Sequence, residues 1–261
     1  MDAFVFLFSG TLGLLLGSFV NVVASRGPRA WGLADDDGLP RNVAYPPSQC
    51  DGCDRRLHPL ELVPVASFLM LAGRCRTCGA AIGLRHVIVE ILGGVIGVAI
   101  AWRFGATPEA IAVAIFLFTA LAAGAIDWET GYLPDALTLP LIPLGLGASP
   151  LLPHGVISGV LGMVMAGGGS WLLAAGYKRL RGFEGLGGGD VKLLAAIGAW
   201  TGVMAVPFVL LLSSVTGILA ALLAMLRSRS GDGLRMEIRF GPFLGFGAAA
   251  VLLFAPPWVF A

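Results

Sequence analysis

The stretch VKLLAAIGAWTGVMAVPFVLLLSSVTGILAALLAML, residues 191–226, contains a single charged side chain, that of Lys192. A membrane-spanning helix needs about 20 predominantly apolar residues, so this stretch is too long for one crossing. Gly202 and Pro207 offer a break, because both residue types are unfavourable inside a helix. We therefore expect a short helix followed by a longer one.

The rest of the chain has the same character. Of its 261 residues, 57% are apolar and 13% are charged, whereas about a quarter of the residues of an ordinary soluble domain are charged. Its apolar runs are as long as a bilayer is thick, which excludes a soluble protein with a large core. The net charge of +1 gives no reason to expect a nucleic-acid partner. We expect an all-α integral membrane protein with about eight transmembrane helices, two from the stretch above and the others from residues 3–24, 87–102, 109–126, 137–152, 155–177 and 241–260.

The distribution of charge predicts the orientation. Asp2 precedes the first apolar run, whereas Arg26 and Arg29 follow it. The positive-inside rule then places the N-terminus outside and the following loop in the cytoplasm. The same flanks argue against a secretory signal peptide, which begins with a basic segment. Carried through eight spans, this orientation places every Lys and Arg except Arg103 on the cytoplasmic side.

All four cysteines lie in the long loop 25–86, as the pairs Cys50/Cys53 and Cys75/Cys78. Two C-x-x-C pairs with 21 residues between them match the spacing of a four-thiolate zinc site. Disulfides or a redox pair are the alternative, but cytoplasmic thiols stay reduced. Four thiolates leave no open coordination position, so the zinc is expected to be structural.

Other residues of this loop also have expected roles. Gly52 and Gly79 suit the turns around a metal. His58 could substitute as a ligand, although a packing or solvent-facing role is favoured. The segment LHPLELVPVASFLMLAG, residues 57–73, is too apolar for a solvated loop. We expect it either at the membrane interface or packed under the cysteine pairs.

Two aspartates stand where apolar segments meet the cytoplasmic face. Asp190 follows three glycines at the start of the run 191–226, and Asp127 lies at the end of the run 109–126. Asp190 could merely cap a helix. However, ionisable groups at this depth are usually functional, and two neighbouring carboxylates can act as general base and general acid. Spacing alone leaves Glu129 and Asp135 open as partners of Asp190, although Asp135 is also a candidate N-cap.

These residues carry a family resemblance. The chain resembles bacterial type IV prepilin peptidases, which are leader peptidases and N-methyltransferases of the GxGD class of membrane aspartic proteases. Five motifs carry it in order along the chain: GSFVNVV (17–23), the cysteine motif in two segments, PPSQCDGC (46–53) and AGRCRTCGAAIGLRHVIVEILGG (72–94), AIDWETGYLPDALTLPL (125–141), GLGGGDVKLLAAIGAWTG (185–202) and RFGPFLGFG (239–247).

The resemblance implies specific roles. It makes Asp127 and Asp190 the catalytic pair and makes Cys50, Cys53, Cys75 and Cys78 the zinc ligands. It implies cleavage of prepilins or pseudopilins after the glycine that ends a basic leader, at the cytoplasmic face of the inner membrane. It also implies methylation of the new amino terminus with S-adenosylmethionine, whose binding residues no motif identifies. The implied parts are a first helix (1–24), a zinc-binding domain (25–86) and a membrane-embedded peptidase domain (87–261).

The roles of two polar residues at membrane depth are left open by these motifs. Asn21 is expected to form an interhelical hydrogen bond. Glu90 could do the same, or could serve the methyltransferase site or recognise the pilin terminus. The acidic residues 35–37 are expected to form a solvated cluster.

Two other classes of protein also fit the sequence. A transporter could use intramembrane aspartates for ions, and an inactive scaffold for pilus assembly could keep the same fold.

Overall fold

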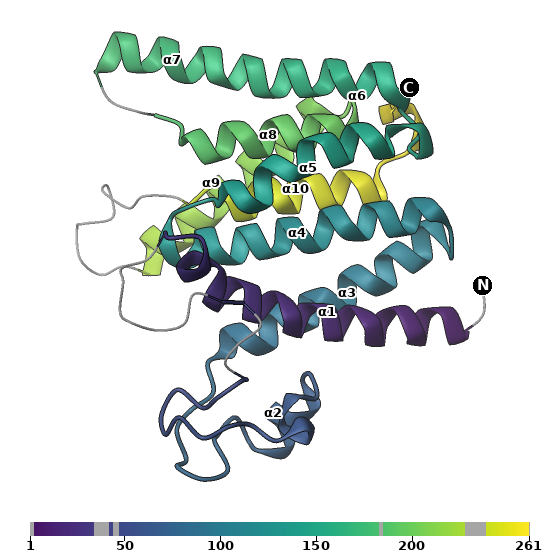
Figure 1. The fold of residues 1–261 in the computed structure, drawn as a ribbon. Coiled ribbons are helices and arrows are strands. Elements are labelled where there is room, and N and C mark those ends of the chain that lie inside the picture. Colours follow the sequence, from purple (N-terminus) through teal and green to yellow (C-terminus); the bar gives the residue numbers. More distant parts are fainter. Residues whose placement is uncertain (1–2, 34–41, 44–46, 183–184, 228–238, 261) are drawn as a thin grey trace. The chain divides into compact units, whose positions relative to one another are not determined.

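The computed structural model describes residues 3–33, 42–43, 47–182, 185–227 and 239–260. The acidic cluster expected at residues 35–37 lies outside this range. The chain forms two compact units, residues 1–125 and 126–261, and the described parts of both are helical, with isolated β-bridges in the cysteine loop. Figure 1 gives the order of the elements along the chain.

The first unit contains α1 (Ala3–Ala30), the short helices η1 (Pro59–Leu62) and α2 (Ala66–Met70), α3 (Leu84–Phe104) and most of α4 (Pro108–Thr130). Helices α1 and α3 pack closely because glycines face each other. A Cβ atom on Gly13 would overlap the Gly93 carbonyl group, and one on Gly17 would lie 2.8 Å from the Val89 oxygen. Small residues one turn apart allow such close approach between membrane helices.

Asn21 adds a polar contact to this pair of helices. Its Nδ2 atom donates to the His86 carbonyl oxygen at 2.9 Å. The expected interhelical hydrogen bond is therefore confirmed.

The second unit is built around α8 (Gly188–Thr201), which packs against its neighbours α5 (Asp135–Ala148), α6 (Gly155–Met163) and α10 (Gly241–Phe254). The π-helical turn η3 (Val164–Gly168) joins α6 to α7 (Gly169–Arg181) without a break. Trp200 of α8 is buried, and its Nε1 atom donates to the Leu141 carbonyl oxygen at 2.7 Å. These contacts fix the position of α8, which carries Asp190 in its first turn.

The break expected inside residues 191–226 is confirmed. Helix α8 ends at Thr201, and Gly202 follows with a φ of +76°, a conformation that favours glycine. Helix α9 (Val206–Arg227) begins one residue before Pro207. Proline is tolerated there because the first N–H groups of a helix lack intrahelical partners.

The expected number of about eight transmembrane helices is too high when the helices are judged by their length and composition. Among the described residues, five helices are long and apolar enough to cross a membrane: Ala3–Ala30, Leu84–Phe104, Pro108–Thr130, Gly155–Arg181 and Val206–Arg227. Helices α5, α8 and α10 have 14 residues each, or about 21 Å at 1.5 Å per residue, against a hydrocarbon core of about 30 Å. An apolar run in the sequence thus need not become a helix of full length.

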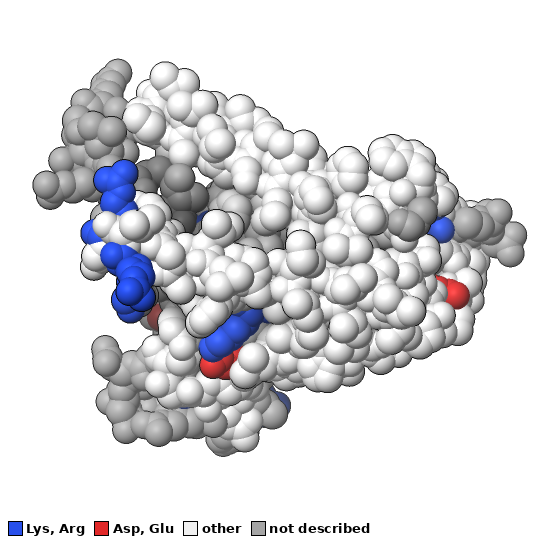
Figure 2. Space-filling model, turned by 90° about the horizontal axis from the view of Figure 1, so that it is seen from above, with Lys and Arg blue, Asp and Glu red and all other residues white. Residues whose placement is uncertain are grey.

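The surface matches a membrane environment. Many large apolar side chains of α1, α3, α7 and α9 are exposed, with Phe4, Leu173 and Leu211 among them. Uncharged residues dominate the face seen in Figure 2, and the blue side chains of Lys and Arg gather mainly toward one end of it. Such a surface suits contact with lipid chains better than contact with water.

Candidate active site and candidate metal centre

Asp127 lies in the last turn of α4 and is 5% exposed. Its Oδ2 atom accepts the N–H of Gly241, the first residue of α10, at 2.9 Å. The first N–H groups of a helix have no partner inside the helix, and the positive end of the helix dipole favours a carboxylate there. The start of α10 therefore holds the Asp127 carboxylate in place.

Asp190 is the third residue of α8 and is half-buried. The N–H of Gly187, which caps this helix, donates to its carboxylate. An acidic side chain that reaches back from this position to the cap residue forms half of a capping box. Asp190 thus has the capping contact expected of a structural residue, but it also has a second carboxylate close by.

Leu133 lies against a glycine beside each of the two aspartates. A Cβ atom on Gly189 would lie 2.7 Å from the Leu133 Cβ, and one on Gly241 would lie 3.0 Å from its Cδ2. Gly189 adjoins Asp190, whereas Gly241 holds Asp127. The Asp127 carboxylate is close enough for its charge to act on Asp190. The negative charge of one carboxylate favours the protonated form of its neighbour, so that one can act as a base while the other acts as an acid.

The start of α10 and the residues just before it supply two residues whose roles were not predicted from the sequence. Gly241 donates to Asp127, and the Arg239 guanidinium lies close enough for its charge to act on the same carboxylate. Both belong to the segment RFGPFLGFG, residues 239–247. That segment carries part of the family resemblance, and this was the only sequence signal for their position.

The other two acidic candidates are placed differently. Asp135 Oδ1 forms an ion pair with Lys192 Nζ at 2.6 Å. The expectation that Asp135 is an N-cap is wrong, because α5 begins at Asp135 itself and Pro134 occupies the cap position. Glu129 is exposed. The structure therefore brings Asp127 toward Asp190, whereas Asp135 pairs with a lysine.

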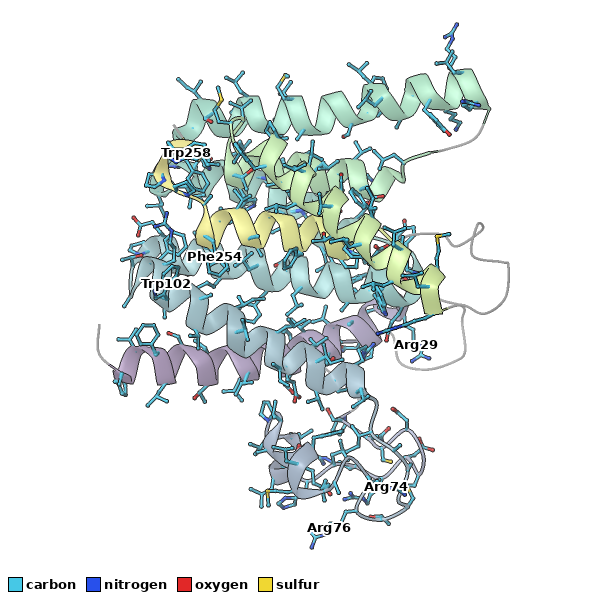
Figure 3. The ribbon with its side chains drawn as sticks, turned by 180° about the vertical axis from the view of Figure 1, so that it is seen from behind. Arg29, Arg74, Arg76, Trp102, Phe254 and Trp258 are labelled. Carbon is cyan, nitrogen blue, oxygen red and sulfur yellow. The ribbon has the colours of Figure 1, made fainter. Side chains whose placement is uncertain are left out.

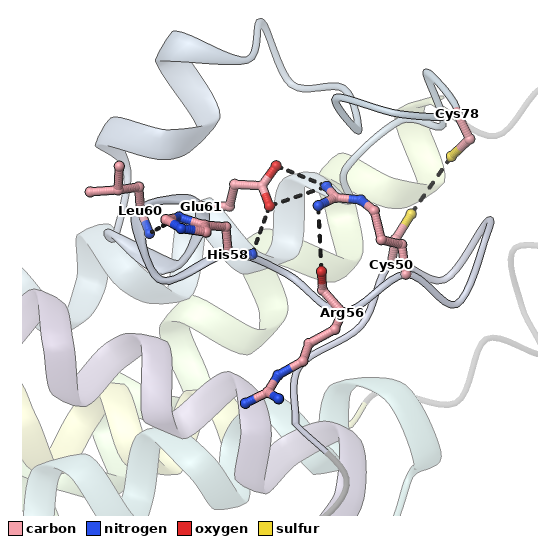
Figure 4. A network of polar contacts seen from close by, with 7 residues as sticks. Cys50, Arg56, His58, Leu60, Glu61 and Cys78 are labelled. Atoms are coloured by element: carbon pink, nitrogen blue, oxygen red, sulfur yellow. Dashed lines mark hydrogen bonds and ion pairs between the residues drawn. The ribbon is translucent and has the colours of Figure 1, made fainter.

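The four cysteines of the first unit come together. Their sulfur atoms all lie within 4.8 Å of one another, so Cys50, Cys53, Cys75 and Cys78 form a group that could hold a metal ion. The Sγ atoms of Cys50 and Cys78 are 3.7 Å apart, as drawn in Figure 4. Backbone N–H groups of Cys78 and Thr77 lower the pKa of the Cys75 thiol to about 6. A lowered pKa favours the thiolate, which is the form that binds metals.

The two cysteine pairs lie on similar turns. The residue after the second cysteine of each pair has a positive φ, +52° at Asp54 and +71° at Gly79. Gly79 therefore has the turn role expected of it. Gly52 has another role, because a Cβ atom there would lie 2.8 Å from the Ala80 Cβ of the other turn. Glycine at position 52 lets the two turns approach each other.

A network of polar contacts supports this cluster. Arg55 Nη2 donates to both carboxylate oxygens of Glu61, at 2.8 and 3.1 Å. The Arg55 side chain also donates to Cys75. His58 caps η1, since its N–H donates to Glu61 Oε2 and its Nδ1 accepts from Leu60 (Figure 4). His58 was expected to face solvent or to pack, and its side chain is exposed; the group of potential ligands does not include it.

Comparison with known proteins matches both units. Residues 11–104 match the family described as the bacterial peptidase A24 N-terminal domain, and residues 114–222 match the type IV leader peptidase family. A prepilin leader peptidase/N-methyltransferase from Burkholderia pseudomallei is 41% identical over 274 residues, which cover 96% of this chain and 86% of the relative. Proteins of the same name from Neisseria gonorrhoeae and Pseudomonas aeruginosa are 36% and 37% identical, with 94% and 93% of this chain and 88% of each relative covered. No solved structure gives a significant match.

Proposed function

Because this chain belongs to the type IV leader peptidase family, we propose that it removes the basic leader of type IV prepilins or pseudopilins. Cleavage follows the glycine that ends the leader, at the cytoplasmic face of the bacterial inner membrane. The new amino terminus is then methylated with S-adenosylmethionine. The family match and the names of the relatives support both activities.

Asp127 and Asp190 form the catalytic pair. One carboxylate accepts a proton from water, whose oxygen attacks the scissile carbonyl carbon. The other carboxylic acid protonates the leaving amine as the C–N bond breaks. The observation that carries this assignment is that Leu133 touches the glycine next to Asp190 and the glycine that holds Asp127. Asp135 is a weaker candidate because Lys192 already neutralises it.

The location of the pair suits its substrate. Asp127 stands at the end of α4 and Asp190 at the start of α8, so both lie at helix ends instead of the middle of a span. A prepilin is cut just before its apolar helix, and the scissile bond is therefore at the membrane surface. The distribution of Lys and Arg supports a cytoplasmic position for this surface. The division into residues 1–24, 25–86 and 87–261 stays a prediction; α1 extends to Ala30.

The cysteine cluster binds one structural zinc ion. A tetrahedral site with Zn–S bonds of about 2.3 Å sets sulfur atoms about 3.8 Å apart, and Cys50 and Cys78 lie 3.7 Å apart. When bound, the zinc would join the two turns and would leave no coordination position for a substrate. Arg55 would offset part of the negative charge of four thiolates through its hydrogen bond to Cys75.

Methyl transfer rests on the names of the relatives and the family resemblance. S-adenosylmethionine, when bound, would supply an electrophilic methyl group. This chain must then present the neutral amino terminus of the cleaved pilin. We assign no residue to that step.

Cleavage of a prepilin by the purified protein in lipid nanodiscs tests the proposal. Asp127→Asn and Asp190→Asn should each lower the rate by at least about 10²-fold, because an amide can act neither as base nor as acid. Asp135→Asn is the matched control, and it should keep most of the activity because an exposed ion pair contributes little.

Three outcomes would contradict parts of the proposal. A wild-type protein that does not cut any prepilin would favour a transporter or a scaffold. If Asp135→Asn loses cleavage while Asp127→Asn retains it, Asp135 and not Asp127 is the catalytic partner of Asp190. Methylation of a pre-cleaved pilin should survive Asp127→Asn, and its loss there would tie methyl transfer to the same carboxylates.

A further inference from the structure

The segment between the two cysteine pairs is apolar and exposed. Residues 59–73 contain one charged side chain, that of Glu61. Helices η1 and α2 nevertheless expose large apolar side chains: Leu60 is 72% exposed, Leu69 is 71% exposed and Met70 is 85% exposed, and Leu62 and Val63 are also exposed. Contiguous apolar surface of this kind is rare in water and marks a site of contact with lipid or protein.

The single charge of this segment is neutralised within the cysteine loop. Glu61 points its carboxylate at Arg55, and its side chain is 9% exposed. Its pKa is lowered to about 2, first by the hydrogen bond from Arg55 and then by that from the His58 backbone. The outward surface of η1 and α2 therefore carries no exposed charge from residues 59–70.

A hydrogen bond fixes the depth of the segment along α3. The N–H of Val65, which precedes α2, donates to Glu90 Oε2 at 2.8 Å. Glu90 lies six residues after Leu84, the first residue of α3, and is therefore about 9 Å along the helix. Helix α3 is long and apolar enough to span a membrane, and the hydrogen bond ties the start of α2 to a residue within this helix and not beyond its end.

The neighbouring surface of α3 is also apolar. Leu84, Ile88, Ile91 and Val95 recur at helical spacing and are all exposed. Such a stripe on a membrane helix faces lipid chains. The apolar surface of η1 and α2 thus lies at the same depth as the lipid-facing side of a transmembrane helix. The basic side chains Arg74 and Arg76 follow the segment on the same loop (Figure 3).

We propose that residues 59–70 dip into the membrane and pack their apolar side chains against lipid chains of the cytoplasmic leaflet. Glu90 positions this anchor through its bond to Val65. The anchor holds the cysteine cluster at the membrane surface, while Arg74 and Arg76 contact lipid phosphates. Apolar residues beside basic ones are the usual composition of a segment that lies in the interface. This inference does not depend on the catalytic assignment.

Photocrosslinking in nanodiscs tests the anchor. p-Benzoylphenylalanine is placed at Met70 of the full-length protein, and lipid adducts are measured by mass spectrometry after irradiation. Val95, exposed on α3, is the positive control, and Asp51, exposed in the first cysteine turn, is the negative control. The yield of lipid adduct at Met70 should be comparable with that at Val95 and several-fold above that at Asp51. The same substitution at Leu60 on η1 should give a yield of lipid adduct similar to that at Met70. This second position controls for a local disturbance of α2 by the substitution at Met70.

Two results would overturn the proposal. The first is a low yield at both Met70 and Leu60, equal to that at Asp51, which would place the segment in water or inside the protein. The second is a change in the adducts formed at Met70 when prepilin is added. If prepilin adducts replace the lipid adducts at Met70, the surface is a docking site for the substrate helix and not a lipid anchor.

Discussion

Replacing Gly189 with alanine should slow prepilin cleavage strongly, whereas the same change at Gly188 should leave it nearly unchanged. The two glycines are neighbours in the first turn of α8 and differ in what surrounds them. A Cβ atom on Gly189 would lie 2.7 Å from the Leu133 Cβ, but one on Gly188 would meet no atom within 4 Å. The pair therefore isolates one steric contact beside Asp190.

The size of the effect follows from that contact. Carbon atoms pack at about 3.5–4.0 Å, so the new methyl group must move by about 0.8 Å or more. The Leu133 Cβ is fixed to the backbone and cannot rotate away, and the shift must pass to Asp190 or to the chain near Asp127. A displacement of about 1 Å at a catalytic group costs about 10²-fold in rate. We expect a loss of about 10- to 100-fold, with a fall in stability of about 1–3 kcal/mol.

The assay is the initial rate of prepilin cleavage in nanodiscs, with thermal unfolding measured in parallel. Gly188→Ala should be as stable as the wild type or more stable by up to about 1 kcal/mol, because alanine favours helix. Equal losses of activity in the two variants would show that flexibility of the loop, and not the contact with Leu133, explains the glycines. Full activity in Gly189→Ala would refute the close packing itself.

Other predictions concern the cysteine loop and the first unit. The purified protein should contain about one zinc ion per chain, and Cys75→Ser should lower this content in elemental analysis; a metal-free wild type would contradict the assignment. Glu61 has a lowered pKa of about 2, against 4.5 for the free group, so its contribution to stability is present above about pH 4.5 and is lost as the pH falls toward 2. The stability difference between wild type and Glu61→Gln in thermal unfolding should shrink over that range, and a constant difference would exclude the ion pair as its cause. Gly93→Ala should lower the melting temperature of the protein in detergent, because a Cβ atom there would overlap the Gly13 carbonyl group; Gly168→Ala, where a Cβ atom meets nothing within 4 Å, is the control.

The break between α8 and α9 could be predicted from the sequence, but the lengths of the helices could not. Gly202 and Pro207 mark the boundary between α8 and α9 through their own backbone preferences. By contrast, the apolar run at 137–152 becomes a helix that ends at Ala148. Apolarity shows that a segment avoids water, and a segment can do so by packing inside a bundle as well as by crossing a bilayer.

Residue types and spacing determined the class of this protein. Long apolar runs require a membrane, and two C-x-x-C pairs bring four sulfur ligands into one loop. Motifs in order along the chain indicated the family. Each of these properties depends on residues that are close in sequence, or on the bulk preference of side chains for lipid or water, and needs no knowledge of how the helices pack.

Only the tertiary structure decided which carboxylate approaches Asp190 and where the apolar loop segment goes. Asp127 and Asp135 are eight positions apart and equally acidic, but α10 donates an N–H to the first and α8 offers Lys192 to the second. Likewise, the sequence predicts residues 59–70 equally well as a packed or an interfacial segment, and only the structure shows the Val65–Glu90 hydrogen bond that ties them to α3. These outcomes depend on partners that are 25 to 114 residues away along the chain, and contacts at such separations are set by the packing of helices instead of by local sequence.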